Sequence, residues 1–148
     1  MEEYPGEWWT TPTESDSDSG NTIFVTGRLD ISKFQTNPRF SIRVTVTFTY
    51  KPSVTGMPDE ETAEVIKEVT DRLVNVFHSD PVAVLTGIYT GDGIREWVFY
   101  TLSTNIFGRK FNEALSDLPL LPISISAEND PDWAEYREMR SLLDDSDR

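Results

Sequence analysis

Residues 40–50 read FSIRVTVTFTY, and this stretch decides the fold class of the chain. Apolar and polar side chains alternate along it without a break, and such a period of two is typical of a β-strand that buries one face. The apolar set is Phe40, Ile42, Val44, Val46, Phe48 and Tyr50, and the polar set is Ser41, Arg43, Thr45, Thr47 and Thr49. The stretch predicts a strand over 40–50 that needs a hydrophobic layer packed on one side.

Two predicted helices, one before and one after a β-hairpin in the sequence, can supply that layer. Apolar residues recur at helical spacing through 65–77, where Pro58 opens the helix and Pro81 ends it. They recur again through 107–115, after Asn105 as the expected cap. Both helices are therefore predicted to be amphipathic and to lie on the core.

β-rich runs surround these helices. Residues 82–90 and 95–103 flank the turn Gly91-Asp92-Gly93, so they predict a hairpin. A short alternating strand is expected at 123–127, and residues 7–11 and 21–30 predict an N-terminal ribbon. A last helix is expected to start at Asp130-Pro131-Asp132, with Trp133, Tyr136 and Met139 along one side.

The order strand, helix, strand, strand, helix, strand predicts an α+β fold, specifically a ferredoxin-like βαββαβ sandwich with an N-terminal β-ribbon and an extra C-terminal helix. Strands 40–50 and 95–103 are expected at its centre. We divide the chain into an acidic segment 1–22 with an edge strand, a single domain 23–140 and an acidic tail 141–148.

The net charge of −13 over 148 residues disfavours nucleic acid and anionic membranes as partners. With no cysteine and a single histidine, His78, the chain has no thiolate chemistry and no multi-histidine metal site, so no cofactor or metal is expected. The acidic run 16–20 copies only the start of a calcium loop. No secretory signal or membrane-length apolar run is recognised, so a cytoplasmic location is expected.

The sheet face without helices is the expected binding surface. If Trp97 and Phe99 of the third strand lie on it beside Arg43, two large rings need a cover. The chain's own ribbon or last helix, with Trp133 and Tyr136, is one possible cover, and a partner is the other. Arg43, Trp97, Phe99, Trp133 and Tyr136 are thus the predicted partner-binding residues, because aromatic and arginine anchors dominate protein interfaces.

Three function classes follow. The first is a non-catalytic protein-binding or regulatory module whose partner is another protein of basic charge, with the acidic ends assisting encounter and the oligomeric state left open. The second is a small hydrolase that uses Asp92, Glu96 or His78 near the hairpin turn and the first helix. The third is an RNA-binding module in which Trp97 and Phe99 stack on bases.

Three short motifs carry a family resemblance. These are Gly56-Met57-Pro58, Thr90 to Glu96 leading to Tyr100, and Asp130 to Trp133 with Tyr136. With them the chain resembles a bacterial family of uncharacterised proteins, the domain of unknown function 695. The resemblance implies a class and no mechanism. Some members look to be joined to a domain similar to the small acidic protein inhibitors of endoribonuclease E, which implies regulation by protein binding.

Overall fold

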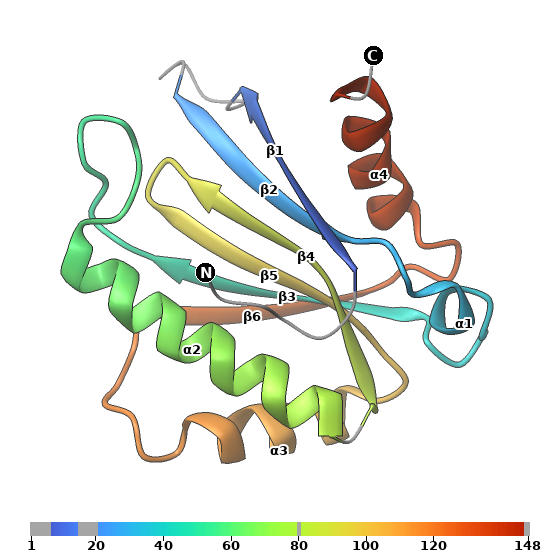
Figure 1. The fold of residues 1–148 in the computed structure, drawn as a ribbon. Helices are drawn as coiled ribbons and strands as arrows, with labels where there is room; N and C mark the ends of the chain where they lie inside the picture. The colour runs from blue at the N-terminus through green and yellow to red at the C-terminus, as the bar shows by residue number, and fades with distance from the viewer. Residues whose placement is uncertain (1–6, 15–20, 80, 147–148) are drawn as a thin grey trace.

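The computed structural model describes residues 7–14, 21–79 and 81–146, and these form an α+β fold around one antiparallel sheet of six strands (Figure 1). The strands are β1 (Trp8–Glu14), β2 (Thr22–Arg28), β3 (Ile42–Thr49), β4 (Ala83–Gly91), β5 (Ile94–Thr101) and β6 (Ile123–Asn129). The helices are α1 (Ser32–Gln35), α2 (Glu60–Ser79), α3 (Thr104–Leu115) and α4 (Ala134–Ser146). The strand order in space is β1-β2-β4-β5-β3-β6, so the sequence prediction of an α+β fold is confirmed.

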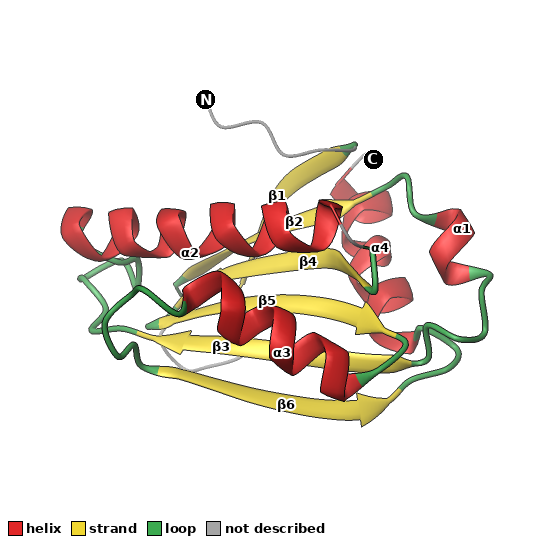
Figure 2. Ribbon diagram, turned by 90° about the horizontal axis from the view of Figure 1, so that it is seen from below, coloured by secondary structure: helices red, strands yellow, loops and turns green. Residues whose placement is uncertain are grey.

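Helices cover both faces of the sheet (Figure 2). The long helix α2 and the shorter α3 lie together on one face, where they enclose the larger hydrophobic cluster, called here the α2/α3 core. Helix α4 lies on the other face and contacts β1 and β4, where a second cluster, the α4 core, is buried. The sheet is thus the middle layer of three over part of its width, and α4 makes its main contacts with β1 and β4.

Strand β3 follows the predicted alternation from its first residue. Val44, Val46 and Phe48 are buried in the α2/α3 core, and the polar residues between them face the opposite side. Phe40 is the exception, because it precedes the strand and lies in the α4 core instead. The strand alternation holds only where ladder hydrogen bonds fix the pleat, so a residue outside the ladder is free to turn to the other layer.

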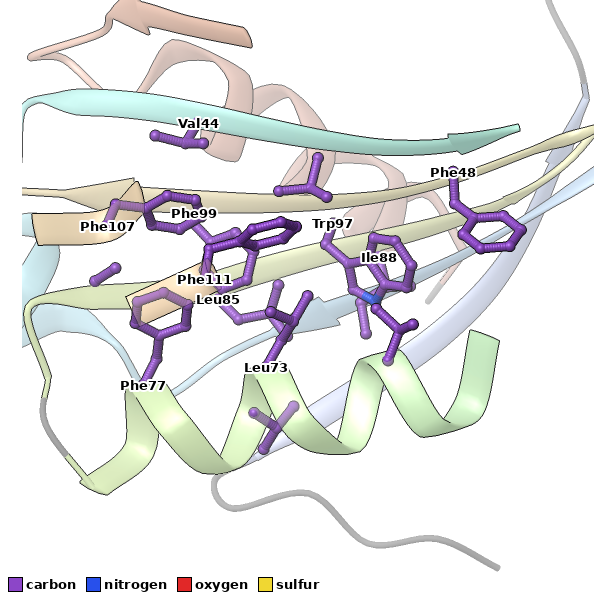
Figure 3. Packing of buried hydrophobic residues seen from close by; sticks show 14 of the residues in the cluster. Val44, Phe48, Leu73, Phe77, Leu85, Ile88, Trp97, Phe99, Phe107 and Phe111 are labelled. Carbon is purple, nitrogen blue, oxygen red and sulfur yellow. The ribbon is translucent and has the colours of Figure 1, made fainter. Parts of the chain in front are cut away.

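Trp97 and Phe99 lie in the α2/α3 core, so their predicted place on a helix-free face is wrong (Figure 3). In the antiparallel register Trp97 pairs with Val46 and Phe99 with Val44, which puts all four side chains on the same side of the pleat. Neither ring is exposed to solvent. The Trp97 indole N–H donates to Thr70 of α2 over 3.0 Å, which satisfies its polar atom inside the core.

The β4–β5 hairpin forms as predicted. Asp92 and Gly93 have φ of 52° and 83°, the left-handed pair that a tight type I′ turn requires. The cap of α3 differs from the prediction, because Ser103 and not Asn105 accepts the hydrogen bond from the Ile106 amide at 3.2 Å. Ser103 has extended backbone, which is the conformation that a capping residue needs, whereas Asn105 is already helical.

Candidate functional site

Asp130 fixes helix α4 to the sheet. Its carboxylate accepts hydrogen bonds from the backbone amides of Ala134 (2.9 Å) and Glu135 (3.2 Å), so it caps the helix. The same carboxylate accepts from the Tyr100 hydroxyl at 2.7 Å and from Arg43 at 3.2 Å. Burial opposes ionisation of this group, but these four donors outweigh it and hold the pKa of Asp130 below its ordinary value.

Helix α4 begins at Ala134, later than the start at 130–132 that the sequence predicts. Pro131 and Asp132 form a turn, and Trp133 follows with φ of 55°, a rare conformation for a bulky residue. Trp133 is held there by two contacts: its ring stacks on Tyr100 at 4.0 Å between centroids, and its indole N–H donates to the Phe40 carbonyl at 2.7 Å. These contacts explain why the strained backbone persists.

Trp133 and Tyr136 are 1% and 2% exposed, so they cover the sheet from within the chain and are not partner anchors. The prediction that the last helix is one possible cover of this face is thereby confirmed for the β1, β2 and β4 side. Arg43 is half-buried and engaged as well, because Glu128 accepts from it at 2.7 Å in addition to Asp130. The five residues predicted to bind a partner therefore belong to the two hydrophobic cores and to an ion-pair network.

A groove of about 810 Å³ lies between α4 and the uncovered part of the sheet. Its floor comes from β3, β4 and β5, and the side chains of α4 form one wall. We call it the acidic groove, because among the described residues five carboxylates and a single arginine, Arg43, line it. The carboxylates belong to Glu14, Asp92, Glu96, Glu135 and Glu138.

Tyr89 and Glu135 form the polar centre of the acidic groove. The Tyr89 hydroxyl donates to Glu135 Oε1 at 2.6 Å, and burial together with the charges of Glu135, Glu96 and Glu138 raises the pKa of Tyr89. Burial also raises the pKa of Glu135, against the hydrogen bond from Tyr89. Glu135 Oε2 is buried without a hydrogen-bond partner among the described residues. Glu135 contacts the phenol directly, Glu96 and Glu138 line the same groove, and the repulsion among these three carboxylates favours a cation nearby.

Glu96 contributes the carboxylate from the floor. It lies on β5, opposite Thr47 of β3 and Tyr89 of β4 in the ladders. Burial raises the pKa of Glu96, and a hydrogen bond from the Thr47 hydroxyl works in the opposite direction. The hydrogen bond from Thr47 thus helps to hold this carboxylate inside the acidic groove.

The residues of the hydrolase hypothesis are not brought together. Asp92 and Glu96 border the acidic groove, whereas His78 borders a separate hollow of about 220 Å³ beside Trp8 and Phe77. Asp92 also holds the loop before β2, since its Oδ1 accepts from the Asn21 amide group at 3.0 Å. Two carboxylates of the three candidates therefore share a surface, and the histidine does not.

The described residues also bear on metal sites, nucleic-acid stacking and membrane-spanning helices. No cluster of three metal-binding side chains occurs in residues 7–14, 21–79 and 81–146, and the acidic run 16–20 lies outside them. Trp97 and Phe99 are inaccessible to a nucleic-acid base, because both are fully buried. Over the part of the chain that the structure describes, no helix is long and apolar enough to cross a membrane.

Sequence reasoning missed Tyr89 and Glu135. Tyr89 stands in an apolar strand and Glu135 on the polar side of a helix, so neither carries a local motif. The predicted hairpin turn could have revealed the position of Tyr89, because extending the β-ladder from that turn pairs Tyr89 with Glu96.

A family model described as a family of unknown function, DUF695, matches residues 14–139. The chain therefore belongs to this family, as its short motifs indicate. No curated protein gives a significant match to the chain.

Proposed function

We propose that this chain is a non-catalytic module that binds a positively charged segment of another protein in the acidic groove. One observation carries the proposal: in the part of the chain that the structure describes, five carboxylates and a single arginine line a groove of about 810 Å³. That arginine, Arg43, already pairs with Glu128 and Asp130, so its single positive charge is shared among several carboxylates. A lysine or arginine side chain would relieve their repulsion.

The charge of the whole chain supports the same kind of partner. A net charge of −13 attracts cations over a distance of about 8–10 Å at physiological salt, which raises the rate of encounter with a basic surface. The half-buried position of Glu96 and Glu135 adds to affinity, since a charge pair is screened less there than at an exposed site.

Binding without catalysis agrees with the placement of the reactive groups. Only Asp92 and Glu96 of the hydrolase candidates border the acidic groove, and Asp92 serves the hairpin turn. We further propose that strands β4, β5, β3 and β6 with α2 and α3 follow the ferredoxin-like plan, and the spatial order β4-β5-β3-β6 supports this. Residues 1–6, 15–20 and 147–148, which hold much of the terminal acidity, lie outside the described residues.

A titration with a defined cationic peptide tests the proposal. We expect an eight-residue peptide of alternating lysine and serine, added to ¹⁵N-labelled protein at pH 7.5, to shift the amide signals of Thr45, Glu96 and Glu138. The double substitution Glu96→Gln with Glu138→Gln should weaken binding about tenfold, equivalent to about 1.4 kcal/mol.

A matched pair of substitutions separates the acidic groove from general acidity. Glu61 and Glu64 are exposed on α2, on the opposite face of the sheet, so Glu61→Gln with Glu64→Gln changes the net charge equally. This control should alter the dissociation constant less than about twofold, because exposed distant charges contribute little. Equal weakening by both double variants would contradict the proposal.

A further inference from the structure

The two edges of the sheet are protected differently. Pro12 lies within β1. The hydrogen bond from Leu29 N to Glu7 O sets a register in which the backbone N–H and C=O groups of the even-numbered β1 residues point away from β2. Pro12 therefore stands where an outward N–H would be, which is a common protection of an edge. Strand β6 reads ISISAEN and contains no proline, lysine or register shift.

The register also identifies the free backbone groups of β6. Its ladder with β3 includes Asp130 N to Ser41 O at 2.7 Å and Thr49 N to Pro122 O at 3.1 Å. In an antiparallel pair these bonds recur at every second residue, so Ser124, Ser126 and Glu128 point their N–H and C=O groups toward β3. The backbone groups of Ile125, Ala127 and Asn129 point outward, and among the described residues no strand pairs with them.

Both faces of β6 are accessible at this edge. Residues 124–129 are all exposed, and β6 is the last strand on its side of the sheet (Figure 2). Ile125, on the α3 side, is 47% exposed and offers an apolar contact. Glu128, on the other side, shares one guanidinium with Asp130, so this corner keeps a surplus negative charge.

We infer that the outer edge of β6 is a second docking site, where an extended positively charged segment of another protein adds a seventh strand. Backbone hydrogen bonds to Ile125, Ala127 and Asn129 would hold the segment, as in β-strand addition generally. Alternate side chains would differ in character, with apolar ones covering Ile125 and basic ones facing Glu128. The net charge of −13 argues for this occupant over a second copy of the chain, which would bring like charges together.

Hydrogen exchange measures the new hydrogen bonds directly. The probe is a nine-residue peptide that alternates lysine and valine, and its control alternates lysine and proline, which carries the same charge with fewer backbone donors. With saturating valine peptide, the amides of Ile125, Ala127 and Asn129 should exchange at least about tenfold more slowly. With the proline peptide their exchange rates should not change.

A substitution at the edge gives an independent readout. Ala127→Pro removes one outward N–H and leaves the ladder to β3 intact, whereas Ala127→Thr keeps that donor. The proline variant should bind the valine peptide about tenfold more weakly, and the threonine variant should bind it like the wild type. If the proline variant fails to fold, the exchange measurement on the wild type decides.

Two outcomes would overturn the inference. The first is unchanged exchange at all three amides in the presence of saturating valine peptide. The second is protection without peptide that grows with protein concentration while the molar mass doubles, which would assign the edge to a second copy. Because β6 does not line the acidic groove, Glu96→Gln with Glu138→Gln should leave the edge protection intact, so the two proposals fail separately.

Discussion

Asp130→Ala should destabilise the protein more than any other single substitution of a charged residue on the α4 side of the sheet. Asp130 is 8% exposed and accepts from two amides of α4, from Tyr100 and from Arg43. Loss of the helix cap costs about 1 kcal/mol. The buried Tyr100 hydroxyl, left without its acceptor, costs about 2 kcal/mol more. Arg43 keeps Glu128 as a partner, so it adds little.

The expected loss is therefore about 3 kcal/mol in the free energy of unfolding, or about 6–12 °C in Tm for a chain of this size. Urea denaturation followed by far-UV circular dichroism at pH 7 measures it. Asp132→Ala is the matched control, because Asp132 is exposed in the same turn and its loss should cost less than about 0.5 kcal/mol.

The pH dependence provides a second check on Asp130. Because its pKa is lowered in the folded state, its contribution is complete above the unfolded pKa of about 4. The contribution is lost as the pH falls through the lower folded pKa, so the gap between wild type and Asp130→Ala should narrow in strong acid. A loss below about 1 kcal/mol at pH 7, or a gap that is constant with pH, would refute the role of Asp130 as the anchor of α4.

Two other predictions test burial. Trp97→Ala should lower the free energy of unfolding by about 3–5 kcal/mol, because it leaves a cavity in the core. In the same urea experiment, Ile125→Ala on the exposed edge should cost less than about 1 kcal/mol. Similar costs for the two variants would place Trp97 at the surface. Glu135→Gln should gain stability relative to wild type as the pH rises above about 4.5, since the raised pKa of Glu135 makes ionisation unfavourable in the folded state. Urea midpoints of wild type and Glu135→Gln at pH 4.5 and 7.5 measure this gain, and an equal stability difference at the two pH values would contradict it.

Local sequence patterns were sufficient to predict an element and its buried face wherever the other side of that element faces solvent. Strand β3 alternates because Val44 and Val46 lie under α2 and α3 while Arg43 and Thr45 face the partly open side. The hairpin turn at Asp92 was readable for a different reason, because few residues tolerate positive φ.

The same logic explains the error over Trp97 and Phe99. Residues 97–100 read WVFY, and all four are buried, because β5 has α2 and α3 on one face and Trp133 and Tyr136 on the other. A strand buried on both faces loses the alternation of polar and apolar residues. The sequence therefore does not show which of its side chains face α2 and α3 and which face α4. Only the pairing of Trp97 with Val46 settles the orientation.

The acidic groove likewise depends on tertiary structure. The sequence determined the order of the six strands and of the helices α2, α3 and α4, but not the four-residue helix α1, and it determined the sign of the charge. Period and composition are properties of neighbouring residues, so they can be read locally. Whether Tyr89, Glu96 and Glu135 meet is decided by where Asp130 fixes α4 across the sheet. That contact joins residues distant in the chain through packing and buried hydrogen bonds, which no local pattern encodes.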